Sequence, residues 1–306
     1  MKYIYVSAII FLLFVVVGCT NSGENYDNTR RDREYLEIKG SDTMVQLVSN
    51  LAEAYSEIDS SVRISATGGG SGTGIAGLIN GENQIVSSSR PIEEEELNLA
   101  SQKGLQVIEI IIGKDTISVI VNQDNDITKL TMDELGKIFK GEITNWKEVG
   151  GEEAIISLYG RQSTSGTYRF FREEVVKDEY SPNKRSMEGN QAIVEAIRQD
   201  KTGIGYVGIG YILNENKELV QGINVISVAN NEESEYNSPI SGNIENYPIS
   251  RNLYQYVANK PSKNSALYKF IEFELSNEGQ NIVQETGFFP ISINEIEMNQ
   301  KNLGIE

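Results

Sequence analysis

Apolar residues recur along most of this chain with two spacings, one typical of strands and one typical of helices. Apolar and polar side chains alternate over 35–38, and a run with helical spacing follows at Leu47, Val48, Leu51 and Tyr55. Period-two alternation is typical of a strand, whereas apolar residues three and four positions apart line one face of a helix. The pattern predicts a strand that leads through a tight turn into a helix.

The same succession of strand and helix repeats over the rest of the chain. Further strands are predicted at 62–64, 85–87, 107–112, 117–121, 155–159, 204–207 and 254–258. Further helices are predicted at 75–79, from 93 onward, and at 132–139, 168–176, 191–197 and 266–275. Strands that alternate with helices indicate an α/β fold with mostly parallel sheets.

Three polar segments that contain glycine stand where a predicted strand passes into a helix. They are Gly40–Thr43, Gly68–Gly74 and Arg161–Thr167. A helix start has unpaired backbone N–H donors and a partial positive charge, so it suits a small oxyanion. Ligands of open α/β sheets bind beyond the carboxyl ends of strands, where these segments lie. Together the segments predict an anion that is bound from several sides.

Each segment also has a simpler interpretation. Gly68–Gly74 could form a plain loop, and it lacks the Gly-Lys-Ser/Thr ending of a P-loop. Ser41 or Asp42 could cap the following helix, a role that is compatible with an anion at the same N–H groups. Arg161 and Arg90 are candidate cations for an oxyanion, although an arginine after a strand is commonly a surface or ion-pair residue.

The amino-terminal sequence has the features of an export signal. Residues 4–17 are almost all apolar, too short a run for a comfortable membrane span, and Gly18-Cys19 follows. This arrangement resembles a bacterial lipoprotein signal, which predicts a signal peptide over 1–18 and lipid attachment to Cys19. An uncleaved anchor helix is the alternative. Residues 19–34 are polar and are expected to form a flexible tether to a body that begins near Tyr35.

Charge and composition restrict the function further. The net charge of −17 argues against nucleic acid as a partner. This charge would repel an anion at long range, but salt screens surface charges beyond about 8–10 Å, so local N–H groups and arginines can dominate a closed site. The sequence has no histidine and one cysteine, which removes histidine-based catalysis, the usual zinc ligand sets and a disulfide framework. We expect no cofactor and no metal.

Several short motifs follow one another in a definite order along the body of the chain. They are Gly-Ser-Asp-Thr (40–43), Gly-Gly-Gly-Ser-Gly-Thr-Gly (68–74), Ser-Ser-Arg-Pro-Ile (88–92), Thr-Asn-Trp (144–146), Arg-x-x-x-Ser-Gly-Thr (161–167), Gly-Ile-Gly-Tyr-Val-Gly (203–208) and Tyr-Pro-Ile-Ser-Arg (247–251). Their joint order, from about residue 36 to about residue 290, resembles the phosphate-binding lipoproteins of bacterial ABC importers. The resemblance implies a two-lobed, type II-like periplasmic-binding-protein fold with phosphate in a cleft between the lobes.

The resemblance also implies an organisation and partners. Residues 35–113 with 253–306 are expected to form the first lobe and 114–252 the second, with a crossing near Gly113. The implied partners are inorganic phosphate, the permease subunits of an ABC importer, and a membrane reached through the lipid on Cys19. We expect a monomer that is exported and lipid-anchored to the outer face of the cell membrane or in the periplasm.

The residues of the phosphate site are implied by the same motifs. Thr43 would supply a hydroxyl and a backbone N–H from the first helix start, Ser71 would do so from the second, and Arg161 would be the main cation. The full expected set is Ser41, Asp42, Thr43, Ser71, Ser89, Arg90, Arg161, Ser165, Gly166 and Thr167.

Ser89 departs from the pattern of the family. Many members have an aspartate at this position, and it accepts the proton of phosphate. Asp42 is the nearest replacement in this sequence. A buried carboxylate favours protonated phosphate and repels sulfate, which has no proton at neutral pH. The departure therefore leaves the choice between phosphate and other oxyanions open.

Other functions remain as alternatives to a phosphate receptor for an importer. The same scaffold could bind sulfate, molybdate or tungstate, or it could serve as a phosphate-sensing or adhesion protein at the cell surface. An enzyme with Ser71 or Ser165 as nucleophile is disfavoured, because the sequence has no histidine to activate a serine. The expectation is therefore a binding protein and not an enzyme.

Overall fold

The computed structural model describes residues 34–242 and 244–304 of the chain. The expected signal peptide over 1–18, its lipid-attachment residue Cys19 and most of the expected tether lie outside the described residues. Glu34, the last residue of that tether, is already the first residue of a strand. Within the described ranges, no helix is long and apolar enough to cross a membrane.

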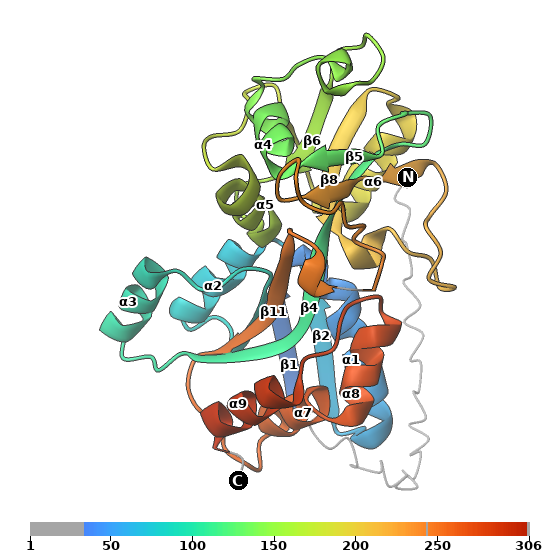
Figure 1. The fold of residues 1–306 in the computed structure, drawn as a ribbon. Coiled ribbons are helices and arrows are strands. Elements are labelled where there is room, and N and C mark those ends of the chain that lie inside the picture. The colour runs from blue at the N-terminus through green and yellow to red at the C-terminus, as the bar shows by residue number, and fades with distance from the viewer. Residues whose placement is uncertain (1–33, 243, 305–306) are drawn as a thin grey trace, which may run out of the picture. The chain divides into compact units, whose positions relative to one another are not determined.

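A sheet whose outer strands pair in parallel and whose central strands pair antiparallel runs through the described body and has helices on its faces (Figure 1). Its strands follow the order β2-β1-β3-β11-β4-β8-β6-β7, and β9 also pairs with β4. The bounds are β1 Glu34–Gly40, β2 Val62–Thr67, β3 Ile85–Ser88, β4 Ile108–Asn122, β6 Ser157–Arg161, β7 Arg185–Met187, β8 Gly203–Gly208, β9 Ile223–Val225 and β11 Ser250–Val257. A separate two-stranded sheet joins β5 (Lys129–Thr131) to β10 (Ser227–Ala229). The α/β fold predicted from the alternation of strands and helices is confirmed.

The first lobe is built around the parallel strands β1, β2 and β3. The predicted helical face at Leu47, Val48, Leu51 and Tyr55 is buried in its core. Figure 1 shows the carboxy-terminal helices beside the same strands, although they are far away in sequence. The helices of this lobe are the 3-10 turn η1 (Asp42–Met44), α1 (Val45–Ile58), α2 (Ser71–Ile79), α3 (Glu94–Gln102), α7 (Ala266–Glu274), α8 (Asn277–Glu285) and α9 (Ile293–Leu303).

The second lobe is built around β6, β7 and β8, which are also parallel. A second core of aromatic and aliphatic residues, including Phe139, Phe171 and Tyr206, fills one side of this part of the sheet. The helices here are α4 (Met132–Lys140), α5 (Gly166–Phe171), which continues as a π-helical turn over Arg172–Val176, and α6 (Gly189–Gln199); short 3-10 turns lie at Trp146–Val149, Ile209–Tyr211 and Ile244–Asn246.

Helix α4 shows how local sequence sets the ends of these elements. Thr131 and Glu134 form a reciprocal capping box at its start, which satisfies two N–H groups that have no partner within the helix. Gly141 ends it with φ of 82°, a conformation that glycine adopts without steric cost. The helix that was predicted over 132–139, with Gly141 at its end, is confirmed.

Strands β4 and β11 pass through both lobes, and β11 pairs along its length with residues 108–116 of β4. The sequence predicts two strands at 107–112 and 117–121, whereas the structure has one continuous strand, so the predicted break is wrong. The register of the pair shifts between Leu253 and Tyr254. Such a bulge bends a strand without ending it, which explains why the glycine at 113 does not interrupt β4.

Helices α8 and α9 and the short strands β5, β7, β9 and β10 have no counterpart in the sequence prediction. Both helices are rich in polar residues, so their apolar spacing is weak. Their starts are marked instead by capping hydroxyls, since Ser276 accepts from the N–H of Gly279 and Ser292 accepts from that of Glu295. Caps of this kind are a local signal that apolar periodicity does not contain.

A carboxyl group lies buried in the core of the first lobe. Glu274, the last residue of α7, has no solvent exposure, and its Oε1 accepts a hydrogen bond of 2.8 Å from Nε2 of Gln255. Glu274 Oε2 and Gln255 Oε1 have no hydrogen-bond partner among the described residues. Burial raises the pKa of the Glu274 carboxyl well above its usual range, because a charge there would lose its hydration.

We predict that the Glu274→Gln variant loses part of the pH dependence of stability. The raised pKa means that the folded state keeps the Glu274 proton where the unfolded chain has released it, so this group stabilises the fold below its ordinary pKa and the stabilisation declines as pH rises. Glutamine does not titrate. Denaturant unfolding from about pH 5 to about pH 8 should show a smaller decline for the variant than for the wild type. Glu272→Gln, at an exposed position of the same helix, is the matched control; parallel profiles for Glu274→Gln and wild type would contradict the assignment.

Candidate functional site

The turn after β1 lies against the end of β3. Gly40 has φ of 138°, and a Cβ atom there would lie 2.2 Å from the carbonyl oxygen of Ser87. Only glycine permits so close an approach. The N–H of Ser41 then donates to the same carbonyl at 2.9 Å. This contact places the first predicted oxyanion segment beside Ser88 and Ser89, which follow in β3 and its turn.

Asp42 connects the three predicted segments. Its Oδ1 accepts from the N–H of Gly69 at 3.0 Å, and its Oδ2 accepts from Nη2 of Arg161 at 2.5 Å. Neither oxygen caps the helix that follows, and Ser41 makes no capping bond either. The helix-cap interpretation is therefore wrong for both side chains, because their polar atoms bind other loops.

Arg161, the last residue of β6, is a fully buried cation. Its Nη2 pairs with Asp42, whereas Nε and Nη1 have no hydrogen-bond partner among the described residues. Its backbone is held by Tyr206, whose hydroxyl accepts from the Arg161 N–H, and by Lys184, which donates to the carbonyl. Burying a charge is costly unless it is paired and hydrogen-bonded. Two nitrogens without hydrogen-bond partners on such a cation therefore point to an anionic ligand.

Buried hydroxyl groups from both lobes gather in the same region. Ser41 Oγ donates to Ser89 Oγ at 2.9 Å, and Ser71 Oγ lies 3.4 Å from that atom. The N–H of Ser89 donates to Ser71 Oγ at 3.1 Å. On the other side, Thr43 Oγ1 of the first lobe is 3.0 Å from Thr167 Oγ1 of the second. Such hydroxyls are donors for an oxyanion.

The segments Gly68–Gly74 and Arg161–Thr167 touch each other. The N–H of Gly72 donates to the carbonyl of Thr164 at 3.1 Å. A Cβ on Gly166 would lie 2.3 Å from Ser71 Oγ and 2.8 Å from Ser89 Oγ. The absence of a side chain at Gly166 therefore lets the start of α5 approach the serine hydroxyls of the first lobe.

Two residues of the predicted set make other contacts. Ser165 Oγ accepts from the N–H of Tyr168 and so caps α5. The guanidinium of Arg90 donates to both carboxylate oxygens of Glu96, at 2.8 and 2.6 Å, and to the carbonyl of Pro91. Arg90 is therefore neutralised by the start of α3, and both of its Nη atoms have partners, in contrast to Arg161.

Three further residues belong to this cluster and were missed by the sequence prediction. Arg251 donates to Thr167 Oγ1 at 3.0 Å, Asp115 pairs with Arg251, and Asn190 donates to Thr43 Oγ1 at 3.5 Å. Arg251 ends the Tyr-Pro-Ile-Ser-Arg motif, and Asp115 is a charge within an apolar strand, so both had a signal in the sequence. We find no such signal for Asn190.

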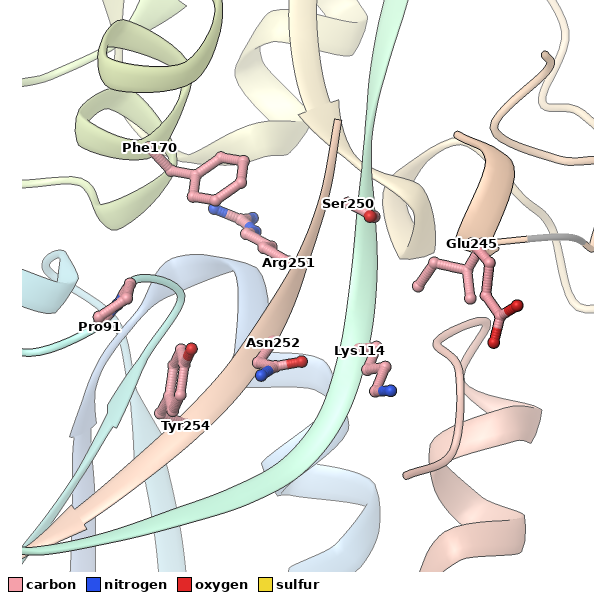
Figure 2. A pocket seen from close by; sticks show the side chains of 9 residues that line it. Pro91, Lys114, Phe170, Glu245, Ser250, Arg251, Asn252 and Tyr254 are labelled. Carbon is pink, nitrogen blue, oxygen red and sulfur yellow. The ribbon is translucent and has the colours of Figure 1, made fainter. Parts of the chain in front are cut away.

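Figure 2 shows Arg251 extended toward the ring of Phe170. Its guanidinium carbon lies 5.7 Å from the centre of that ring, and a cavity of about 350 Å³ lies beside both residues. Burial raises the pKa of Asp115 and lowers the pKa of Arg251, and in each case the opposite charge of the partner works against the effect of burial.

The donors of the cluster suit a small oxyanion and not a metal ion. The cluster contains buried hydroxyl groups and two buried arginines, and each arginine pairs with one carboxylate, Arg161 with Asp42 and Arg251 with Asp115. Within 34–242 and 244–304, no group of three or more histidine, cysteine, aspartate or glutamate side chains could hold a metal.

Comparisons with known proteins agree with this geometry. A model of the PBP superfamily domain matches residues 26–278. The phosphate-binding protein PstS of Pseudomonas aeruginosa is 32% identical over 288 residues, which cover 88% of this chain and 87% of that protein. A crystal structure described as a phosphate ABC transporter substrate-binding protein with bound phosphate, from Clostridium perfringens, has a TM-score of 0.72 and 26% identity, and the match covers 85% of this chain and 100% of that one.

A phosphate-binding protein PstS from Borreliella burgdorferi is 29% identical over 292 residues, covering 92% of this chain and 98% of that protein. The fold and the comparisons thus define a substrate-binding protein of the PBP superfamily. The chain belongs to the family of the PstS phosphate-binding proteins.

Proposed function

We propose that this protein binds inorganic phosphate between its two lobes and delivers it to a membrane-bound ABC importer. The observation that carries the proposal is Arg161, a fully buried cation whose Nε and Nη1 have no partner among the described residues and whose Nη2 pairs with Asp42, between Ser41 and Thr43. A guanidinium donates charge-assisted hydrogen bonds to an oxyanion, so the unpartnered Nε and Nη1 can each donate to a phosphate oxygen. The relatives that are named as phosphate-binding proteins support this choice of anion.

The remaining donors would complete the shell around the anion. In this proposal Ser41, Thr43, Ser71, Ser89 and Thr167 contribute hydroxyls, and the starts of α2 and α5 contribute backbone N–H groups, including that of Gly166. Ser165 holds the start of α5 in place, and Arg90 shapes the loop that carries Ser89. Preorganised donors in a buried site bind an anion strongly because water does not compete for them.

We place the boundary between the lobes where the crossing strands bend. Residues 35–113 with 253–306 form the first lobe and 114–252 form the second. The pairing of Gly113 with Leu253 and the register shift that follows support this division. Because β4 and β11 connect the lobes, each lobe can move as a unit about this point.

The proposed location is outside the cell membrane. The signal-like sequence over 1–18 and the single cysteine that follows it support export with lipid attachment at Cys19, and 19–33 would serve as the tether. The protein would then act as a monomer that meets the importer's permease subunits at the membrane surface.

We propose a binding protein and not an enzyme. Ser71 and Ser165 are the serines that could attack a phosphoryl group, but their hydroxyls accept from backbone N–H groups of Ser89 and Tyr168. Neither contacts a general base in the described structure. Ser71 is therefore placed to donate its proton to a bound anion rather than to lose it.

Phosphate should bind one-to-one and raise the melting temperature. A ligand that binds only the folded state adds stability by mass action, about 2.7 kcal/mol at a hundred times its Kd. Calorimetric titration and thermal unfolding would be performed on protein freed of ligand by unfolding and refolding. Protein without any shift at millimolar phosphate would defeat the proposal.

Arg161→Ala should weaken phosphate binding far more than Arg90→Ala does. Removing a buried, charge-assisted contact typically costs about 2–5 kcal/mol, and the loss at Arg161 also leaves Asp42 without its partner. Arg90 is already paired with Glu96, so its loss should act only through the shape of its loop. Titration calorimetry of both variants measures the difference. Equal affinities of the two variants would remove Arg161 from the site.

Asp42→Asn should narrow the preference for phosphate over sulfate. A carboxylate accepts the proton of phosphate and repels sulfate, whereas an amide can donate to either anion. Competition binding with both anions at neutral pH gives the ratio, and Asp133→Asn, at an exposed carboxylate that pairs with Lys137, is the matched control. An unchanged ratio in Asp42→Asn would show that discrimination comes from other residues.

A further inference from the structure

We propose that Arg251 is a positioning residue of this site, which holds the hydroxyls of Thr43 and Thr167 so that they donate protons to the bound anion. The two threonines come from different lobes, and Arg251 lies on β11, one of the strands that connect them. The inference rests on the proposed phosphate function and assigns a specific task to a residue outside the expected set.

The guanidinium of Arg251 is held on nearly all sides by the protein. Its Nε and Nη2 donate to Asp115 Oδ2 at 3.0 and 2.7 Å, and its Nη1 donates to the carbonyl of Ser89 at 2.9 Å. Asp115 is anchored in turn, because its Oδ1 accepts from the N–H of Ile209 at 3.0 Å. All three nitrogens of the Arg251 guanidinium therefore have partners within the protein, whereas two nitrogens of Arg161 have none among the described residues.

The same Nη2 reaches both threonine hydroxyls. It lies 3.0 Å from Thr167 Oγ1 and 3.4 Å from Thr43 Oγ1. A guanidinium can only donate, so each hydroxyl must use a lone pair toward Arg251 and direct its own proton elsewhere. Asn190 Nδ2 also lies within 3.5 Å of Thr43 Oγ1 and can only donate. The environment of the two oxygens thus orients them as proton donors.

Counting the protons shows why this matters for an anion. The two hydroxyls are 3.0 Å apart and own two protons, of which only one can be shared between them. At least one proton is therefore left without an acceptor among the described residues. If the guanidinium were missing, the Thr167 hydroxyl could rotate, and a lone pair could face the anion and repel it.

The Arg251→Lys variant distinguishes this positioning role from an effect of the positive charge alone. It keeps the positive charge, but its single nitrogen cannot reach the carboxylate of Asp115, the carbonyl of Ser89 and both hydroxyls together. The cavity beside Arg251 can admit water when the larger guanidinium is removed, so the variant should still fold (Figure 2).

A double-mutant cycle tests the inference. Phosphate affinity is measured by calorimetry for the wild type, Arg251→Lys, Thr167→Val and the double variant, all freed of ligand. Arg251→Lys should weaken phosphate binding about tenfold or more, which is the effect of losing a charge-assisted hydrogen bond. In the Thr167→Val background the same substitution should weaken binding clearly less. Arg198→Lys, at an arginine that pairs with Glu195 away from the site, should match the wild type.

The outcomes are distinguishable. Equal fold-changes in both backgrounds, or no effect of Arg251→Lys, overturn the positioning role while phosphate binding by the wild type stands. A wild type that does not bind phosphate overturns the proposed function and this inference together. If thermal unfolding without phosphate shows that Arg251→Lys is not folded, Asp115→Asn replaces it in the cycle, because it loosens the anchor and leaves Arg251 present; additivity with Thr167→Val then overturns the inference.

Discussion

The arrangement of this site depends on a full positive charge that has no access to solvent. Arg161 is buried with one nitrogen paired to Asp42 and two without partners. A buried cation of this kind is tolerated only when its surroundings are polar and an anion can join it. The loops of both lobes supply polar groups to this region, since Asp42 pairs with Arg161 and the buried hydroxyls of Thr43 and Thr167 meet across the lobes. The cost of burying Arg161 is thus tied to the capacity to bind a ligand.

A second buried ion pair, Arg251 with Asp115, has the opposite character. Its groups are satisfied within the protein and sit on β4 and β11, the strands that join the lobes. Pairing them there fixes the donors of both lobes relative to the point about which the lobes can bend. Arg161 therefore keeps two nitrogens available for the ligand, whereas Arg251 is fully bonded within the protein and orders the groups around it.

Much of the fold follows from local patterns in the sequence. Strands and helices alternate as the spacing of apolar residues predicts. The core-facing side of the helix at 47–55 and the helix over 132–140 also appear where the pattern predicts them. The break predicted in β4 is wrong because a bulge bends the strand without ending it. The polar helices α8 and α9 are missed because they bury too few apolar residues to show a period.

The sequence by itself determined the class of fold, the three glycine-containing segments and the candidate residues, because backbone geometry and helix starts are local properties. Only the tertiary structure decided which polar groups meet. Asp42 pairs with Arg161, 119 positions away, and Thr43 meets Thr167 and Arg251 across the lobes. Arg90 follows a strand and Arg161 ends one, yet Arg90 is paired with Glu96 at the start of α3, whereas Nε and Nη1 of Arg161 have no partner among the described residues. The partner of a buried charge is set by long-range packing, which residue spacing does not encode.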